Sequence, residues 1–365
     1  MAWSPSVLPF SDRKPRRPAP VASGILDAAV SAVQSGLPTT ILLGGPALSP
    51  AGLRAADRIS QATDARILME TFPARIEQGA GMPSAQRLAY DPNQARAQLA
   101  QTQDLVLAGA RPPISFYACP DEPSELAPHG CRHLALGEPG QDIESALEFI
   151  ADELADGSRP RVAPRTLQPK KKGRLSILPR AGNLSLHTMA QAIAATLPED
   201  CIVVEETISS NAALGPAMAR TTPHTLLTLI GGALGQGLPA ATGAAIAAHD
   251  RPVLALESDG SVLFTIQALW TQAREHLNVT TVIINNSSCQ ILQAEFPRFG
   301  NQQAETAAER ILELTDPSID FVALSEGLGV PARRVTTSEQ LISALHDAYA
   351  DSGPHVIEAV VPRNG

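Results

Sequence analysis

The sequence predicts an α/β protein with two doubly wound domains, each built on a largely parallel sheet, and three observations support this class. Short apolar runs that favour strands alternate with helical patterns along most of the 365 residues. A segment rich in Gly, Ser, Pro and Lys interrupts this alternation at residues 157–178, as a linker does. The composition is 44% hydrophobic and 18% charged, which is typical of a globular chain long enough for two cores.

These features divide the chain into four parts. Residues 1–20 are an extended segment rich in proline, and residues 21–156 are a Rossmann-like domain. Residues 157–178 are the linker, and residues 179–365 are the second α/β domain. The basic residues of the first segment are interpreted as solvated linker, with an anion-binding arm as the alternative.

The first domain is predicted to alternate helices and strands in order. Ser49 and Pro50 mark the start of its second helix, because serine caps helices well and proline fits the first helical turn. Helices are expected at 25–34, 50–62, 93–101 and 143–154, and strands at 39–43, 66–70, 104–108, 114–117 and 133–136.

Two glycines, Gly44 and Gly45, follow the first strand of this domain. They raise the alternative of a dinucleotide-binding loop and a nicotinamide-dependent oxidoreductase. The fingerprint G-x-G-x-x-G is absent, and the next strand does not end in a convincing acidic residue. The pair is therefore interpreted as a glycine turn.

The second domain begins with a helix capped by Ser185 and a strand at 201–204 that leads to Ser209. A glycine-rich loop at 231–239 opens a helix of small residues at 240–248. Further elements are expected at 253–256, 279–284, 304–314, 321–328, 338–349 and 355–361. A helix between the first two of these carries apolar residues on or near one face, namely Phe264, Leu269, Trp270, Ala273 and Leu277.

The unit at residues 253–288 carries the chemistry. Asp259 and Asn286 follow neighbouring parallel strands at the edge where open α/β sheets bind ligands. The helix between them starts just after Gly260 and Ser261, so its free N–H groups favour an anion. A carboxylate and an amide oxygen beside a phosphate suit Mg²⁺. Asp259-Gly260 alone is more simply a turn, and Asn285-Asn286 alone is more simply a strand end. The combination predicts a metal and phosphate site.

This arrangement resembles the thiamine diphosphate motif, in which an Asp-Gly pair is followed at a fixed distance by Asn-Asn. Asn286 lies 27 residues after Asp259, as the motif expects, although Ser258 replaces the usual Gly or Ala. The chain is similar to thiamine diphosphate-dependent 2-oxoacid enzymes, most of all acetolactate synthase large subunits and benzoylformate decarboxylases. The likeness is carried by GGALGQGLPAATGAA, ESDGSVLFTIQALWTQAREHLNV, NNSSCQILQAEF and DFVALSEGLGVPARRVTT.

The resemblance implies thiamine diphosphate and Mg²⁺ as cofactors and a small 2-oxoacid as substrate, and it leaves FAD open. It implies Asp259, Asn286 and the carbonyl of Ser288 as metal ligands. It also implies cofactor-binding roles. Gly260 and Ser261 would hold the diphosphate with help from Ser209, the carbonyl of Gly232 would bind the aminopyrimidine, and Leu234 would support the bent cofactor.

The same resemblance implies a missing part. The family begins with a pyrimidine-binding domain whose glutamate activates the cofactor, and we expect this chain to lack it. Glu205, Glu206 and Glu295 are assigned to a different part of the fold, so the catalytic acid is unknown. We expect a homo-oligomer or a partner chain with the missing domain. The alternative is a truncated, non-catalytic relative that still binds the cofactor.

Several functional classes are disfavoured by bulk properties. The net charge of −9 argues against a nucleic-acid surface. The most membrane-like stretch, 225–248, is interrupted by several glycines, Gln236 and Pro239. We find no secretory signal pattern and four scattered cysteines, which we interpret as buried thiols of a cytoplasmic protein.

Overall fold

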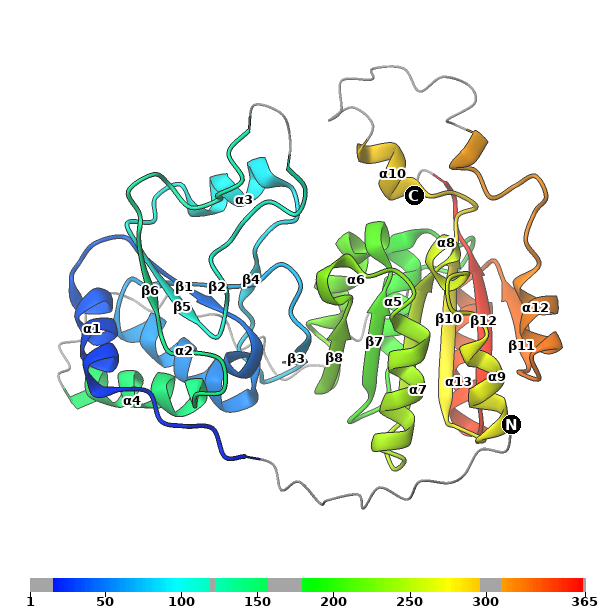
Figure 1. Cartoon of the computed structure of the whole chain (residues 1–365). Coiled ribbons are helices and arrows are strands. Elements are labelled where there is room, and N and C mark those ends of the chain that lie inside the picture. Colours follow the sequence, from blue (N-terminus) through cyan, green and yellow to red (C-terminus); the bar gives the residue numbers. More distant parts are fainter. Residues whose placement is uncertain (1–15, 119–121, 157–178, 296–309, 364–365) are drawn as a thin grey trace, which may run out of the picture.

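The computed structural model describes residues 16–118, 122–156, 179–295 and 310–363. These residues form two α/β domains that lie side by side (Figure 1). Within these ranges, no helix is long and apolar enough to cross a membrane. The predicted linker at 157–178 and most of the first segment lie outside the described residues.

The first domain holds a five-stranded sheet in the order β4-β2-β1-β5-β6, and every pairing is parallel. All residues of the central strands β1 and β5 are buried, because helices and loops cover both faces of the sheet. The strands are β1 (Thr39–Leu43), β2 (Arg66–Met69), β4 (Gln86–Arg87), β5 (Asp104–Ala108) and β6 (Arg132–Ala135). The helices are α1 (Ser23–Gln34), α2 (Pro50–Ala62), α3 (Pro92–Leu99) and α4 (Ile143–Asp156).

The predicted start of α2 is confirmed, because the Ser49 side chain accepts a hydrogen bond from the Gly52 amide and Pro50 is the first helical residue. The predicted strand at 114–117 is wrong. Only Ile114 forms an isolated bridge there, with Glu125. The neighbouring aromatic side chains pack with other aromatic residues at the domain boundary instead of joining the sheet.

The crevice of the first domain, between β1 and β5, is closed by the chain itself. The Gly45 amide donates to the Glu70 carboxylate at 3.1 Å. A Cβ on Gly109 would lie 2.4 Å from the Gly44 carbonyl oxygen, so the two backbones touch. This packing favours the interpretation of Gly44 and Gly45 as a turn, because the amide that would face a phosphate already binds a carboxylate.

The second domain holds a seven-stranded sheet in the order β11-β12-β10-β9-β7-β8-β3. Its two faces have separate cores: Leu254 and Leu256 of β9 pack on one side, and Val253 and Ala255 on the other. The parallel strands are β7 (Ile202–Glu206), β8 (His224–Thr228), β9 (Val253–Ser258), β10 (Val279–Asn285), β11 (Ala332–Val335) and β12 (His355–Val360).

Helices cover both faces of this sheet, so the predicted fold class of two doubly wound domains is confirmed. One face carries α5 (Leu186–Thr196), α6 (Asn211–Met218) and α13 (Ser338–Ala350). The other carries α7 (Gly237–Ala247), α9 (Ala268–Arg274) and α12 (Phe321–Gly327). The predicted cap at Ser185 is confirmed by a complete capping box with Thr188.

One strand joins the two domains. Strand β3 (Arg75–Gln78) precedes β4 in sequence but pairs antiparallel with β8 at the edge of the second sheet. Its residue Ile76 is 1% exposed and belongs to the core of both domains. Strand β3 was not predicted, because four residues between a proline and a glycine show no clear hydrophobic period.

Several other predictions need correction. Strands β4, β8 and β11 and helix α6 were not expected. The predicted helix after Asp259 is divided into α8 (Asp259–Val262), a turn and α9. Leu269 is fully buried, but Phe264 and Trp270 are 62% and 51% exposed, because Phe264 lies in the turn that changes the helical phase. Of the helix predicted at 304–314, residues 304–309 lie outside the described part.

The cysteine prediction is correct for one thiol. Cys201 is buried and its pKa is raised to about 12 by that burial. Cys131 and Cys289 are partly exposed and free, so the prediction of buried thiols is wrong for them. Cys119 lies outside the described residues.

Candidate functional site

The candidate site lies where the chain order of the second sheet reverses. From β7 the chain continues to β8 on one side, whereas β9 and β10 lie on the other. Ligands of open α/β sheets bind at such a point, beyond the carboxyl ends of the strands. Figure 1 shows α6, α8 and α10 (Gln290–Glu295) at this edge. The predicted residues Ser209, Asp259 and Asn286 follow β7, β9 and β10 there, as expected.

Asp259 is the centre of a hydrogen-bond network at this edge. Its Oδ2 accepts from the amides of Asn286 at 3.0 Å and Ser287 at 2.6 Å, and its Oδ1 accepts from the Gly260 amide at 2.8 Å. The side chain is 2% exposed, and burial raises its pKa while these amides oppose the rise. The network therefore orients a nearly buried carboxylate between two strand ends.

The turn after β10 separates the roles of the two asparagines. Asn285 donates to Glu358 at 2.7 Å and accepts from the Ser287 amide, so it anchors the turn. Asn286 is 8% exposed, and its Oδ1 accepts from the Ser288 amide at 3.0 Å. Ser287 holds this shape with a φ of 55°, a conformation that costs energy outside glycine and is found often at functional sites.

The donor set at this turn fits a divalent cation. Asp259 supplies a carboxylate, Asn286 an amide oxygen, and Ser288 a carbonyl that accepts no hydrogen bond among the described residues. The Ser288 hydroxyl is also buried without a partner. The described residues contain no group of three His, Cys, Asp or Glu side chains that could hold a metal. A site with one carboxylate suits Mg²⁺ that shares phosphate and water oxygens.

The diphosphate side of the site differs from the sequence prediction in two details. Helix α8 has only four residues, and the Gly260 amide is not free, because it donates to Asp259. Ser261 is 2% exposed, and its hydroxyl donates toward the Glu206 carbonyl at 3.3 Å and the Ser258 carbonyl at 3.2 Å. Ser209 is partly exposed, and its hydroxyl makes no hydrogen bond with the described residues, so it remains available to a ligand.

The glycine-rich loop is held by a carboxylate at the end of β7. Glu206, at the end of β7, accepts from the Gly235 amide at 2.5 Å and from the Gly237 amide. Gly231 and Gly232 have φ values of 59° and 66°, which only glycine adopts without strain. Glu206 therefore positions the loop that carries Gly232, a role that was not predicted from the sequence.

A second buried carboxylate lies beside this clamp. Glu257 of β9 is 1% exposed, and one of its oxygens has no hydrogen-bond partner. A Cβ on Gly237 would lie 2.0 Å from Glu257 Oε1 and 3.0 Å from Glu206 Oε2. Burial, and then the charges of Glu206 and Glu205, raise the pKa of Glu257 well above its ordinary value. Only glycine at position 237 lets the loop approach both carboxylates.

Gly232 and Leu234 face a large cavity between the domains, with a volume of about 960 Å³. Leu234 is 42% exposed, and a Cβ on Gly232 would lie 2.7 Å from the Phe116 ring of the first domain. Glu295 also lines this cavity and hydrogen-bonds to Tyr90 of the first domain, a position that was not predicted from the sequence.

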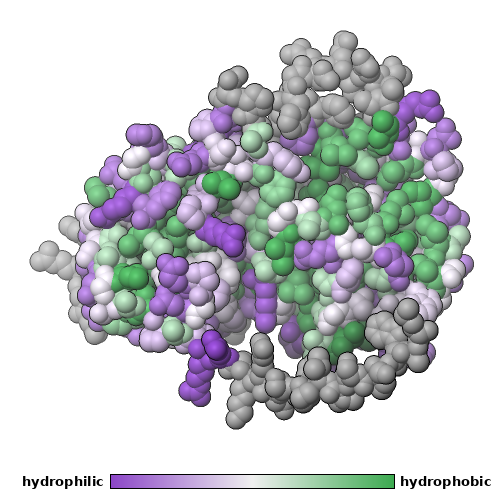
Figure 2. Space-filling view, in the orientation of Figure 1, coloured by the Kyte–Doolittle hydropathy of each residue, from purple (hydrophilic) through white to green (hydrophobic). Residues whose placement is uncertain are grey.

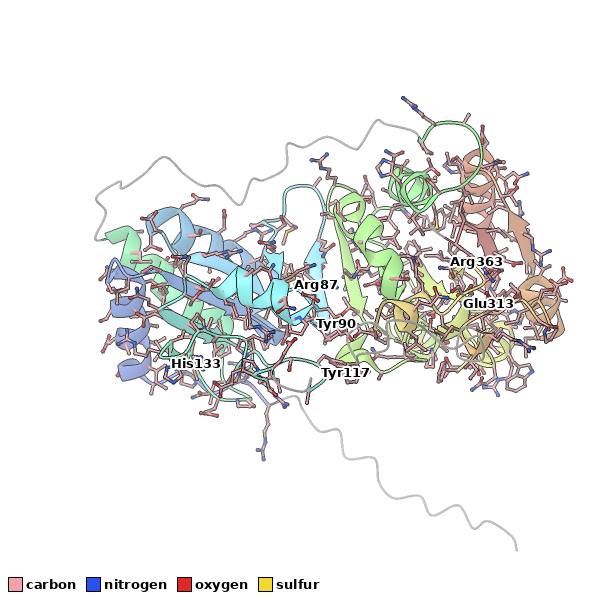
Figure 3. All side chains as sticks on the ribbon, turned by 90° about the horizontal axis from the view of Figure 1, so that it is seen from above. Arg87, Tyr90, Tyr117, His133, Glu313 and Arg363 are labelled. Atoms are coloured by element: carbon pink, nitrogen blue, oxygen red, sulfur yellow. The ribbon has the colours of Figure 1, made fainter. Side chains whose placement is uncertain are left out.

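Arg87 enters the same cavity from the first domain. Figure 3 shows Arg87, Tyr90 and Tyr117 on the side of the first domain that faces the second. Arg87 and Glu257 were not predicted from the sequence. A charged residue inside the apolar run of β9 was a visible signal for Glu257, whereas Arg87 depends on contacts between domains.

Comparison with known proteins accounts for this geometry. Residues 209–359 match the family described as thiamine pyrophosphate enzyme, C-terminal TPP binding domain; pyrophosphate and diphosphate are two names for one group. The chain is also 49% identical over 331 residues to the provisionally named acetolactate synthase large subunit IlvX of Mycobacterium tuberculosis. Residues 209–359 of this chain belong to the thiamine diphosphate-dependent enzyme family.

The alignment with IlvX covers 90% of this chain and 62% of the relative. A benzoylformate decarboxylase of Pseudomonas aeruginosa is 28% identical over 283 residues, which are 72% of this chain and 49% of that protein. The chain thus spans between about half and two thirds of the length of these two relatives.

The fold has a known counterpart. The solved 4-hydroxybenzoylformate decarboxylase of Rhodococcus jostii RHA1, a thiamine diphosphate-dependent enzyme, matches with a TM-score of 0.77. The match covers 96% of this chain and 66% of that one at 24% sequence identity. At this identity the match confirms the two-domain architecture of the family member described here.

Proposed function

We propose that this chain is the diphosphate- and Mg²⁺-binding part of a thiamine diphosphate enzyme that decarboxylates a small 2-oxoacid or joins it to a second carbonyl compound. The observation that carries the proposal is the meeting of Asp259, Asn286 and Ser288 at the point where the sheet order reverses. Bound thiamine diphosphate would supply a thiazolium carbon that stores the electrons left by the departing CO₂.

The protein groups have separate tasks in this proposal. Asp259, Asn286 and the Ser288 carbonyl would hold Mg²⁺, and Ser209 would bind a diphosphate oxygen. Glu206 would fix the glycine-rich loop so that the Gly232 carbonyl meets the aminopyrimidine. The exposed Leu234 would support the bend of the cofactor.

A further domain is needed for activity under this proposal, because none of the described carboxylates takes the role of the activating glutamate. The exposed apolar surface of the second domain supports the proposal that a further domain covers it. In Figure 2, hydrophobic residues gather over the visible face of the second domain, whereas hydrophobic and hydrophilic residues mix on the first. The second domain exposes several large apolar side chains, namely Ile230, Leu234, Ile246, Leu263, Phe264, Trp270 and Leu292. A pyrimidine-binding domain, from a longer form or another chain, would cover such a surface within an oligomer.

Calorimetric titration of the protein with thiamine diphosphate and Mg²⁺ tests the cofactor site. We expect binding that EDTA abolishes and that Asp259→Asn weakens at least about tenfold, because even supporting residues of metal sites have effects of this size. The matched Asp250→Asn variant changes an exposed turn and should bind like the original chain. Equal binding by Asp259→Asn would contradict the proposed metal site.

Release of CO₂ from a 2-oxoacid tests the second part. We expect no turnover by the chain alone, and turnover when the pyrimidine-binding domain of a longer relative is added as a separate chain. Turnover without that domain would refute the two-part enzyme. Cofactor binding without turnover in any combination would support the alternative, a non-catalytic relative that binds thiamine diphosphate.

A further inference from the structure

We propose that the cavity between the two domains binds a planar aromatic carboxylate, with Arg87 as the anchor of the carboxylate group. The inference rests on the proposed function only where it identifies this ligand with the 2-oxoacid that reacts at the bound cofactor. Binding at Arg87 stands on the cavity itself and can be measured without the cofactor.

The cavity has the size and the walls of a site for a small molecule. Its volume of about 960 Å³ lies at the upper end of the range for ligand pockets, roughly 300–1,000 Å³. It extends from Arg87 of the first domain to Ile208, Gly232 and Leu234 of the second. A ligand held at Arg87 would therefore lie in the same space as the residues expected to face the cofactor.

Four aromatic side chains form one wall of this space. The Phe116 ring lies 5.3 Å from Phe72, 5.8 Å from Tyr90 and 4.7 Å from Tyr117, measured between centroids. The angles between these planes range from 50° to 84°, so the rings meet edge to face or tilted and do not stack. Phe116 and Tyr117 are 38% and 55% exposed, which leaves ring surface for a planar ligand.

The charge in the cavity favours an anion at one point. Arg87 is the single Arg or Lys among the described lining residues. Its guanidinium makes no hydrogen bond or ion pair with the described residues, although Glu205 is near enough to act on its charge. Burial lowers the pKa of Arg87, and the charge of Glu205 only partly opposes this effect. A carboxylate would satisfy the planar guanidinium with two parallel hydrogen bonds.

The carboxylates that line the cavity are already bound to protein groups. Glu77 pairs with Arg75 and accepts from Thr225, and Glu205 accepts from the amide and hydroxyl of Thr207. Tyr90 hydrogen-bonds to Glu295. Asp91 caps α3 through the Gln94 amide. The acidic groups thus have partners, and the guanidinium is the charged group among the described lining residues that is left for a ligand.

Titration with benzoate, an aromatic carboxylate that cannot lose CO₂ here, tests the site by calorimetry or ligand-observed NMR. We expect benzoate to bind the full chain without thiamine diphosphate. Arg87→Gln should weaken binding by about tenfold or more, since a hydrogen-bonded charge pair contributes that much. Arg87→Lys should keep part of the affinity, and the matched Arg274→Gln variant, at an exposed arginine over Trp270, should keep all of it.

Two further ligands define the chemical class. Benzyl alcohol keeps the ring without the charge, and inorganic phosphate keeps the charge without the ring; both should bind at least about tenfold more weakly than benzoate. Phe116→Leu should weaken benzoate and leave phosphate unchanged. The proposal is overturned if Arg87→Gln binds benzoate as the original chain does, or if phosphate binds as tightly as benzoate.

Separate measurements of benzoate binding and of cofactor binding distinguish the cavity site from the proposed function. Loss of benzoate binding in Arg87→Gln with normal binding of Mg²⁺ and thiamine diphosphate supports both. Benzoate binding that depends on Arg87, in a chain that does not bind the cofactor, would remove the proposed function and leave the cavity site. A melting temperature within a few degrees of the original protein shows that each variant is folded; if Arg87→Gln does not fold, Arg87→Lys and Phe116→Leu carry the test.

Discussion

His224 shows how single residues of this fold depend on burial. Its side chain is 2% exposed on β8, its Nδ1 lies 2.9 Å from the Thr222 carbonyl, and its Nε2 has no partner. Burial lowers its pKa, and the hydrogen bond to Thr222 and the charge of Glu77 oppose this only in part. The folded chain therefore holds a neutral imidazole with Nδ1–H as donor.

This imidazole predicts a loss of stability in mild acid. Between the unfolded pKa, about 6.5, and the lower folded pKa, the unfolded chain binds a proton that the folded chain does not. The free energy of unfolding should fall over that window by about 1.4 kcal/mol for each unit of pKa difference. His224→Asn, which keeps a donor near Nδ1, should remove this dependence when urea unfolding is compared at about pH 7.5 and about pH 5.5.

Two comparisons isolate the effect of His224. The buried carboxyls Glu206 and Glu257, whose pKa values are raised, titrate in both proteins and act in the opposite direction. The difference between variant and original chain therefore belongs to the imidazole. His346→Asn changes an exposed histidine of α13 and should leave the pH profile as it was. The same slope in His224→Asn and the original chain would show that the folded imidazole is not held neutral.

Site residues that lie in one short segment were predicted from the sequence, and contacts between remote segments were not. Asp259 and Asn286 were predicted, because one strand-helix-strand unit brings them together and adjacent parallel strands end at one edge. The contacts of Glu206 were not predicted, because its partners Gly235 and Gly237 lie on a loop about 30 residues away whose path the sequence does not reveal. Arg87 was missed, because its surroundings exist only when two domains meet.

At the scale of elements, helix α7 offers two glycines with opposite expected effects. Gly237→Ala places a Cβ 2.0 Å from Glu257 Oε1 at the start of the helix. Such overpacking should lower the free energy of unfolding by about 1–3 kcal/mol and weaken binding of thiamine diphosphate. A Cβ on Gly243 would have no neighbour within 4 Å. Gly243→Ala should therefore raise the free energy of unfolding by about 0.5–1 kcal/mol, because alanine favours a helix. Urea unfolding of both variants measures this, and equal effects would contradict the described loop packing.

Elements with a clear period and a cap were predicted well, and irregular ones were not. The limits of α2 and α5 followed from Ser49 and Ser185, whose side chains accept hydrogen bonds from the first turn. The strand expected at 114–117 failed for the opposite reason. Its residues favour strands, but contacts with Phe72 and Tyr90 outweigh a local preference of less than about 1 kcal/mol.

At the scale of the whole molecule, β3 protects the edge of the second sheet. Without it, β8 would expose a row of unpaired backbone groups. A chain of residues 179–365 alone should therefore self-associate more than the full chain, as measured by light scattering over a range of concentrations. A peptide of residues 73–80 should reduce that association by restoring the strand. A fragment that stays monomeric without the peptide would show that the edge needs no partner.

The presence of two sheets was predictable from the sequence, but the strand pairing that joins the two domains was not. A linker pattern at 157–178 separates two alternating series, which was enough to expect two sheets. No sequence signal assigned residues of the first series to the second sheet, because a four-residue strand pairs with β8 across about 150 positions. Contacts of this range depend on the assembled core around Ile76 and not on local preference.

The register of the β3–β8 pairing also sets the position of one domain along the other. Arg75 to Gln78 lie opposite Leu227 to His224 in one register. A slip by one residue would turn Ile76 out of the core, so only slips by two residues preserve the buried face. Each such step moves one domain along the other by about 7 Å. The separation of Arg87 and Gly232 therefore has discrete permitted values, and related chains could change the length of ligand they accept by altering one short strand.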